Sequence, residues 1–477
     1  MSLKKIISIL IIILLALSFY ACDPDLFNND NDDDGDGDSS TRYFYMGTTP
    51  GSRTKEQFTL AYQNEKANVW IKSNKIGTEM SEELLTHYGD YFEDHSWPDV
   101  TTYVYKPTEF FGEEGDRINI IFYNDSEGIA GYFWGYDFYS NSASDVEDSN
   151  ETNVFYMAIE AATYNEPNGT DDSKLFTEGT LTHEFQHMCN AHYFRDNSQL
   201  PLDTWANEMS SVLMETMFAG QVDIYVPAYH DDSNFENGVY FIKWDNFFAQ
   251  YTAVSLFGTY LTSQLDEANQ KSLITTLLKK SGSGNTSIHD LVVTLEDSDV
   301  GYWSSSTSPT SDSAVQTKWS DLMGDFLNGL VRNEPTYISF LNSLSSEGSI
   351  SISPVTTTSG TKTLNASAWV IAEVNNANLD STEGCDNEGS DLAYMIAYHD
   401  GLPAWGSSGY YEMPKSYNTC DISTAKTVKK ANPYSDYKPY KYNRSMTPVF
   451  DYPTVKKSSN TSKAVVDGTI KYFYVGR

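Results

Sequence analysis

The sequence has few basic residues for its length. Its 477 residues hold 31 Lys and Arg against 66 Asp and Glu, which gives a formal net charge of −35. A surface this acidic repels phosphate backbones and therefore argues against nucleic acid as a partner. The sequence also lacks a G-x-S-x-G elbow and a Walker-type phosphate loop, so nothing in it indicates a serine hydrolase or a P-loop nucleotide site. The hydrophobic content of 40% is that of a folded protein with a sizeable core.

Cysteine is also scarce, with four residues in the whole chain. Cys385 and Cys420 lie in one C-terminal region, where they can form a disulfide if the protein is exported. Cys189 is expected to be a small buried residue. The remaining cysteine, Cys22, closes the N-terminal segment.

Residues 1–22 have the features of an export signal. Lys4 and Lys5 precede an apolar run over 6–17 that contains one polar residue, Ser8, and is too short to span a bilayer comfortably. The small residue before Cys22 resembles a bacterial lipoprotein cleavage site. Cleavage there would leave Cys22 as a lipidated first residue that anchors the protein to a membrane or cell surface; plain secretion is the alternative.

Residues 23–42 are rich in Asp, Asn and Gly and are predicted to be an extended acidic tether. The run over 29–38 also resembles a calcium-binding loop. It lacks the distal Glu that closes an EF-hand loop, so Ca²⁺ binding is the weaker interpretation.

The rest of the chain is predicted to be α+β, in an order that suggests two domains. Residues 43–342 form the first, with a β-rich half over 43–165 and a helical half over 166–342. Residues 343–362 are rich in Ser, Thr and Gly and indicate a linker. Residues 363–477 return to strand signals and suggest an all-β, sandwich-like module. The expected strands are 68–71, 118–123, 154–159, 368–374, 392–398 and 470–475, and the expected helices are 79–92, 173–192, 203–219, 244–265, 270–280, 288–295 and 318–331, with a loop or hairpin over 128–139.

An H-E-x-x-H motif, His183 to His187, lies within the predicted helix over 173–192. Residues four apart on a helix project from one face, so both imidazoles can bind one zinc ion. Glu184 flanks that face, where a base for a zinc-bound water must stand. The motif alone also fits an amphipathic helix with two surface histidines.

A second helix supplies a third candidate ligand. Glu208 lies 21 residues beyond His187 on the predicted helix over 203–219, after a segment in which Pro201 permits a turn. A catalytic zinc site needs three protein ligands and one open position. The second helix can return across the first and present Glu208 to the metal.

The sequence His183-Glu184-Phe185-Gln186-His187-Met188, followed by Trp205-Ala206-Asn207-Glu208, resembles the gluzincin metallopeptidases and most closely their hyicolysin family. The resemblance covers roughly residues 65–265. It implies a zincin-like fold, a single catalytic Zn²⁺ held by His183, His187 and Glu208, and Glu184 as the base that activates the zinc-bound water.

Other candidate residues follow from likeness to related peptidases. Glu215 lies seven residues after Glu208 and can hydrogen-bond a ligand histidine, unless it is an exposed helix carboxylate. Tyr251 heads the helix over 244–265, as the oxyanion-stabilising Tyr does in aminopeptidases of this type. His230 lies in an expected loop over 229–232. It is the alternative oxyanion donor, because thermolysin-like peptidases use a histidine for this role.

The strand over 154–159 is expected at the sheet edge above the zinc, where it can pair with an extended substrate. Glu160 follows it and can bind a substrate amine, although the local sequence departs from the aminopeptidase motif. The sequence therefore favours a membrane-anchored endopeptidase acting on peptides or proteins. An aminopeptidase and a non-catalytic surface adhesin with a vestigial zinc site are the alternatives, and the oligomeric state is not indicated.

Overall fold

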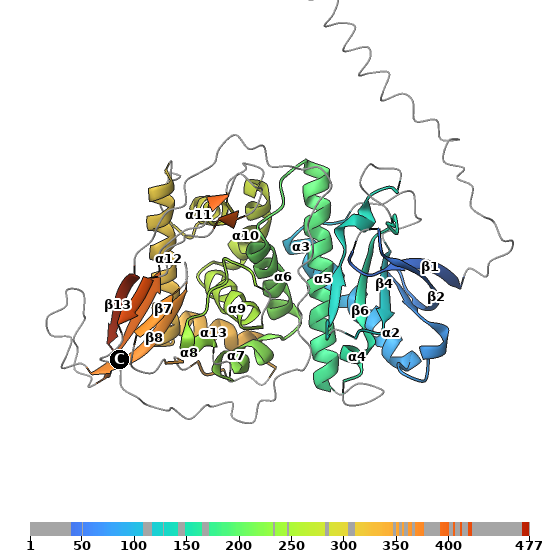
Figure 1. Ribbon diagram of the computed structural model, residues 1–477, viewed down its shortest axis with the longest axis horizontal. Helices are drawn as coiled ribbons and strands as arrows, with labels where there is room; N and C mark the ends of the chain where they lie inside the picture. Colours follow the sequence, from blue (N-terminus) through green and yellow to red (C-terminus); the bar gives the residue numbers. More distant parts are fainter. Residues whose placement is uncertain are drawn as a thin grey trace, which may run out of the picture. The chain divides into compact units, whose positions relative to one another are not determined.

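The computed structural model describes most of the chain between residues 40 and 352 and a set of strands after it (Figure 1). Cys22, Cys385, residues 1–39 and most of 376–469 lie outside the described residues. The described ranges are 40–49, 51–107, 117–126, 128–141, 148–164, 171–231, 234–245, 248–281, 286–303, 311–346, 350–352, 355–356, 361–364, 368–375, 392–399, 404–405, 411–412, 418–421 and 470–476.

A six-stranded mixed sheet forms the first half of the fold, in the order β1-β2-β3-β4-β6-β5. Strands β3, β4 and β6 are parallel to one another, while β2 runs antiparallel to β3 and β5 runs antiparallel to β6. The parallel strands are almost wholly apolar because both of their faces are buried. The strands are β1 (Thr41–Met46), β2 (Thr54–Gln63), β3 (Ala67–Ile71), β4 (Ile118–Tyr123), β5 (Gly131–Phe133) and β6 (Val154–Ala158).

The two faces of the sheet serve different cores. Alternate residues such as Ile120 and Phe155 pack with the helices in the main core, whereas Ile121 and Tyr156 face a smaller aromatic core. A buried ion pair lies beside that smaller core. The guanidinium of Arg53 is 2.7 Å from the Asp137 carboxylate, and both side chains are buried.

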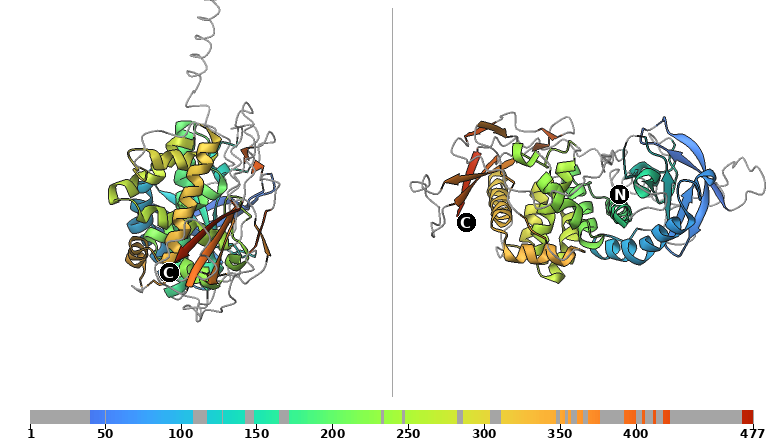
Figure 2. Two further views of the ribbon diagram at one scale, coloured as in Figure 1. Left: turned by 90° about the vertical axis from the view of Figure 1, so that its left-hand side faces the viewer. Right: turned by 90° about the horizontal axis from the view of Figure 1, so that it is seen from below.

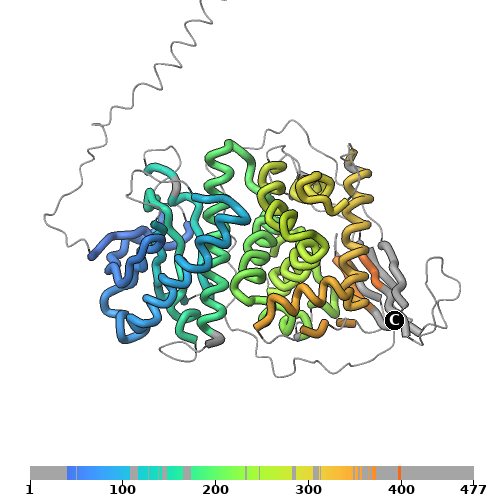
Figure 3. Tube along the Cα trace, turned by 180° about the vertical axis from the view of Figure 1, so that it is seen from behind, coloured from blue at the N-terminus to red at the C-terminus, as the bar shows by residue number. Residues whose placement is uncertain are grey.

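Helices make up the second half. Figures 1 and 3 show α5 between the sheet and the helices that follow it in the chain, with α6 and α9 on the side of α5 that faces away from the sheet. Helix α9 is buried over almost its whole length, so it forms the centre of the helical half. The helices are α2 (Glu82–Tyr91), α3 (Trp97–Tyr103), α4 (Ile159–Ala162), α5 (Asp171–Asn197), α6 (Thr204–Phe218), α7 (Val222–Asp231), α8 (Asn234–Asn237), α9 (Phe248–Ser263), α10 (Glu267–Lys280), α11 (Ser287–Glu296), α12 (Asp312–Arg332) and α13 (Pro335–Leu344), with short η2 (Ser73–Lys75), η3 (Phe92–Ser96) and η4 (Gly135–Phe138).

The C-terminal strands partly match the expected β module. Strands β13, β9 and β8 form an antiparallel sheet, and Figure 2 shows these strands beside α12. Trp369 of β8 packs edge-on against Phe326 of α12, so this sheet is attached to the helical half. A sandwich stays a prediction. The strands are β7 (Thr361–Leu364), β8 (Trp369–Asn375), β9 (Leu392–His399), β10 (Ala404–Trp405), β11 (Tyr411–Glu412), β12 (Asn418–Asp421) and β13 (Ile470–Gly476).

Two local predictions are wrong. The strand over 154–159 is not at the sheet edge, because the three-residue strand β5 pairs with its outer side. The segment over 128–139, which contains β5, was predicted to be a loop or hairpin because it is rich in Gly and aromatic residues. The loop expected over 229–232 is helical as far as Asp231, because α7 continues through Pro227. Among the described residues, no helix combines the length and apolar character needed to cross a bilayer.

Candidate metal centre

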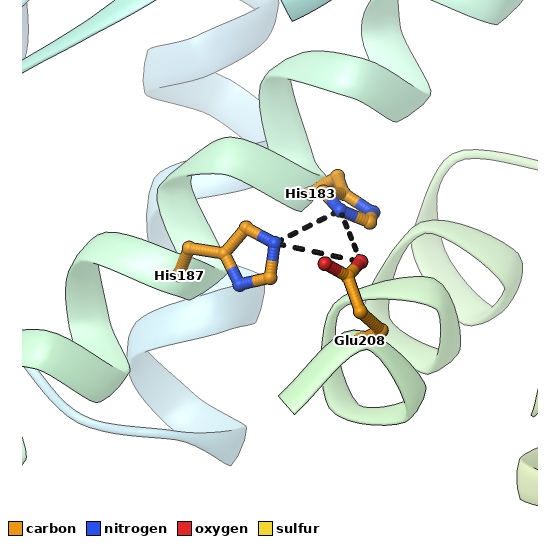
Figure 4. Close-up of side chains that lie close together, drawn as sticks. All are labelled: His183, His187 and Glu208. Carbon is orange, nitrogen blue, oxygen red and sulfur yellow. Dashed lines mark hydrogen bonds and ion pairs between the residues drawn. The ribbon is translucent and has the colours of Figure 1, made fainter. Parts of the chain in front are cut away.

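His183, His187 and Glu208 come together as predicted (Figure 4). The two imidazoles project from one face of α5, and α6 crosses it to present the carboxylate. The Nε2 atoms of His183 and His187 are 3.0 Å apart, and Glu208 Oε2 lies 3.2 Å from the first and 3.7 Å from the second. All three side chains are almost completely buried, so they form a compact group of donor atoms.

This group has the chemistry of a metal site. Both carboxylate oxygens of Glu208 are buried, and neither makes a hydrogen bond of good geometry. Such a carboxylate is costly unless a cation neutralises it. Two imidazole nitrogens and one carboxylate oxygen are ligands that Zn²⁺ accepts, and three protein ligands leave a position open. The residues therefore fit a catalytic zinc ion.

The protonation of the group supports the same interpretation. Burial opposes a charge on His183, but the adjacent carboxylates of Glu208 and Glu215 outweigh it and raise the pKa of His183 to about 10. Burial lowers the pKa of His187. Burial also opposes the charge on Glu208, but the adjacent histidines outweigh it and lower the pKa of Glu208. A proton on His183 thus balances the carboxylate, and a divalent cation can replace that proton.

Glu184 lies beside the ligands without joining them. Its side chain is 6% exposed, more than that of any of the three ligands. The negative charge of Glu184 contributes to raising the pKa of His183 and the pKa of Tyr251, so its carboxylate lies in the same electrostatic environment as both side chains. The role of Glu184 as the base stays a prediction.

Glu215 is buried and faces the site. Its Oε1 lies 3.5 Å from His183 Nδ1, on the opposite side of the imidazole from Glu208. The hydroxyl of Tyr225, on α7, donates a hydrogen bond to the same oxygen. The alternative of an exposed helix carboxylate is therefore wrong, because Glu215 has no exposed surface.

Two residues of this arrangement were not singled out from the sequence. Tyr225 belongs to a helix, α7, that the sequence did not indicate. Gln221, the residue before α7, lies so close to α5 that a Cβ on Gly179 would be 2.6 Å from its side chain. Ser211 lies on the same face of α6 as Glu208 and Glu215, and its Oγ is 2.9 Å from His187 Nδ1. In the sequence, Ser211 could have been found from its position three residues after Glu208, which places both residues on one face of the helix.

Tyr251 is the better placed of the two candidates for oxyanion stabilisation. Its ring centre is 6.1 Å from that of His183, and its side chain is 1% exposed. Burial, reinforced by the charges of Glu208 and Glu184, raises the pKa of Tyr251 well above its usual value. The phenol therefore keeps its proton and can act as a donor.

His230 contacts other parts of the fold. Its ring packs edge-on against Tyr229, and it hydrogen-bonds the backbone of Ser351. Burial lowers the pKa of His230 to about 4, which keeps the imidazole neutral at pH 7. In the described part of the chain, the group of donor atoms that could hold a metal comprises His183, His187 and Glu208 and does not include His230.

Glu160 is the second residue of α4, just after β6, and both of its carboxylate oxygens accept hydrogen bonds. Asn124 Nδ2 donates to Oε1 at 2.8 Å, and the backbone N–H of Asp125 donates to Oε2 at 2.9 Å. These bonds fix the loop after β4. Cys189, predicted to be buried, has no exposed surface.

Comparison with known proteins agrees with the geometry. A family model described as Peptidase M30 matches residues 49–300, which is more than half of the chain and includes all three ligands. Neutral metalloprotease ShpI of Staphylococcus hyicus is 28% identical over 241 residues, which are 47% of this chain and 52% of that protein. The chain thus spans about half the length of this curated relative. On these grounds the chain belongs to the Peptidase M30 family, the hyicolysin family that its H-E-x-x-H motif and Glu208 resemble.

Proposed function

We propose that the protein is a zinc-dependent peptidase in which His183, His187 and Glu208 hold one Zn²⁺. The observation that carries the proposal is the convergence of these three buried donor groups from two crossing helices. Family membership and the name of the relative, a neutral metalloprotease, support the same reaction.

The chain's own residues divide the chemistry between them. A bound zinc ion supplies Lewis-acid activation of water and of the scissile carbonyl. Glu184 accepts the proton of the attacking water and passes it to the leaving amine. The Tyr251 hydroxyl donates a hydrogen bond to the oxygen on which negative charge develops. Glu215, held by Tyr225, keeps the His183 ring oriented toward the metal.

An extended polypeptide is the substrate that the sheet favours. Within the described strands, β5 is the last of the sheet on the side of α5, the helix that bears the histidine ligands. A Cβ on Gly131 of β5 would lie 2.8 Å from Thr180, three residues before His183. A substrate strand can pair with the outer edge of β5 near the metal.

The hydrogen bonds of Glu160 favour an endopeptidase over an aminopeptidase. Its carboxylate already accepts from Asn124 and Asp125, so an incoming amine would have to compete with both. Comparing hydrolysis of free and N-blocked peptides separates the two activities.

We also propose, from the sequence alone, that residues 1–22 direct export and that Cys22 carries a lipid. Residues 23–42 then act as a tether between the membrane and the peptidase over 43–342. Mass spectrometry of the mature N-terminus distinguishes a lipidated Cys22 from plain secretion.

Casein hydrolysis with and without a chelator tests the proposed function. The purified protein is expected to cleave casein internally, to lose the activity with 1,10-phenanthroline at an excess of about 10³-fold, and to regain it with added Zn²⁺. Chelator-resistant cleavage would contradict the metal mechanism. A zinc-loaded protein without cleavage would favour the non-catalytic surface protein.

Replacement of Tyr251 by Phe is expected to lower kcat by about 10²-fold, the usual cost of losing one oxyanion donor. Zinc content should be unchanged, because the hydroxyl is not a ligand. His230→Phe is the comparison, and it is expected to leave kcat close to wild type. A larger loss for His230→Phe than for Tyr251→Phe would reverse the assignment.

A further inference from the structure

An aromatic side chain lies against the proposed oxyanion donor. The indole ring of Trp244 packs edge-on against the phenol ring of Tyr251, with the ring centres 4.9 Å apart and the ring planes at 75°. The phenol therefore has two ring neighbours, Trp244 and the ligand His183. Tyr251 is completely enclosed, whereas Trp244 is partly exposed, so Trp244 belongs to the packing that buries the phenol.

The backbone on both sides of Trp244 is bound by the first turn of α9, the helix that carries the donor. Gln250 in that turn has no exposed surface, and its Nε2 donates to the backbone oxygens of Tyr240 at 3.1 Å and Lys243 at 2.6 Å. Its Oε1 accepts from the backbone N–H of Asp245 at 2.8 Å. One buried amide thus fixes the segment that holds Trp244 to the start of α9.

The contact between the two rings is directional. Among the described residues, the buried Nε1–H of Trp244 has no hydrogen-bond partner, so packing orients the indole. An edge-on aromatic pair has a preferred geometry, because the positive edge of one ring meets the negative face of the other. A donor must lie about 2.7–3.1 Å from the oxygen that it stabilises. Since a displacement of about 1 Å can cost 10²-fold in rate, a contact that restrains the Tyr251 ring has a catalytic consequence.

We propose that Trp244 is a positioning residue for peptide hydrolysis: its ring holds the Tyr251 phenol in the orientation in which the hydroxyl reaches the developing oxyanion. This inference rests on the proposed function, in which Tyr251 is the oxyanion donor. Trp244 does not touch the reacting atoms in this role, so its whole contribution passes through the Tyr251 hydroxyl. Such a contribution disappears when that hydroxyl is removed.

The experiment is a double-mutant cycle in the full chain, with hydrolysis of an internally quenched peptide as the readout. Trp244→Leu is expected to lower kcat by about 10-fold, the rate equivalent of one aromatic pair. KM and zinc content should be unchanged, because neither the substrate nor the metal contacts Trp244 in the proposed role. In the Tyr251→Phe background, the same Trp244→Leu substitution is expected to have no further effect on kcat.

Two further variants separate positioning from packing. Trp244→Phe keeps a ring against Tyr251 and loses an N–H that has no partner in the described part of the chain, so it is expected to retain most of kcat. Trp303→Leu is the matched control: Trp303 is also partly exposed and packs edge-on against a tyrosine, Tyr302, at 5.4 Å. It is expected to keep the wild-type kcat. If Trp244→Leu does not fold, Trp244→Met replaces it, because methionine also removes the ring but fills more of its space.

The outcomes separate this inference from the proposed function. An equal loss of kcat from Trp244→Leu in both backgrounds would overturn the role of Trp244, as would a raised KM, because the residue would then act on the substrate itself. An equal loss from Trp303→Leu would overturn it too, since the effect would be one of general packing. Wild-type kcat in Tyr251→Phe would remove the donor on which the inference rests, whereas chelator-resistant hydrolysis would remove the proposed function.

Discussion

Replacement of Glu184 by Gln is expected to lower kcat for peptide hydrolysis by about 10³-fold, within the range that general acid–base catalysis supplies. Glutamine has nearly the size of glutamate but cannot accept a proton from water. Because Glu184 lies next to the ligands without being one, zinc content should stay at one ion per chain. Hydrolysis of an internally quenched peptide and metal analysis of the same sample measure both quantities.

Glu178→Gln is the control for that experiment. Glu178 lies on α5 as well, but its carboxylate pairs with His87 of α2 at 2.7 Å and makes no contact with the ligands that the structure records in its described part. This variant is expected to keep its activity. Retention of full activity by Glu184→Gln would remove the mechanism, whatever metal the protein contains.

Replacement of Glu208 by Gln is expected to reduce zinc affinity by more than about 100-fold, beyond the effect of losing a ligand's hydrogen-bond partner. The carboxylate is the single anionic ligand of the group and is completely buried. Its amide replacement offers a neutral oxygen in the same place. The variant should therefore be isolated without zinc and without peptidase activity.

Glu215→Gln provides a graded comparison on the same helix. Glu215 contacts His183 on the nitrogen that faces away from Glu208, so its loss should weaken zinc binding by about 10- to 100-fold and less than the loss of Glu208. The reverse order, with Glu215 the more important residue, would show that the ligand assignment is mistaken.

The central elements of the fold were predictable because their hydrophobic patterns are long. The strands at Ile118 and Val154 and the helices around His187, Glu208 and Tyr251 begin and end within a few residues of the predicted limits. Strand β5 escaped prediction because three residues carry no periodicity. Helix α7 escaped because Pro227 and the acidic residues at its end indicate a turn in sequence alone.

The ligand set was predictable for a different reason. His183 and His187 are related by one helical turn, so local geometry alone places them together. To predict Glu208 as a ligand, one must also know how two helices cross. The resemblance to the H-E-x-x-H family supplied that information. Asp203 shows the limit of local rules: it is the N-cap residue of α6, but its carboxylate accepts from the backbone N–H of Ser287 and does not cap the helix.

Ser211 and Tyr225 illustrate what spacing alone does not reveal. A serine in a buried helix resembles any small buried residue until its neighbour across the interface is known. Tyr225 acts on the site through Glu215, and that contact depends on the packing of α7 against α6. Residues that orient ligands are thus set by tertiary structure, whereas the ligands themselves follow local spacing.

The most direct test of the account is the position of the metal in crystals of the protein grown with zinc. Anomalous scattering measured on both sides of the zinc absorption edge locates the ion without reference to activity. The account predicts a single strong peak at about 2.0–2.2 Å from His183 Nε2, His187 Nε2 and a carboxylate oxygen of Glu208. A peak elsewhere, or none at these three side chains, would contradict it.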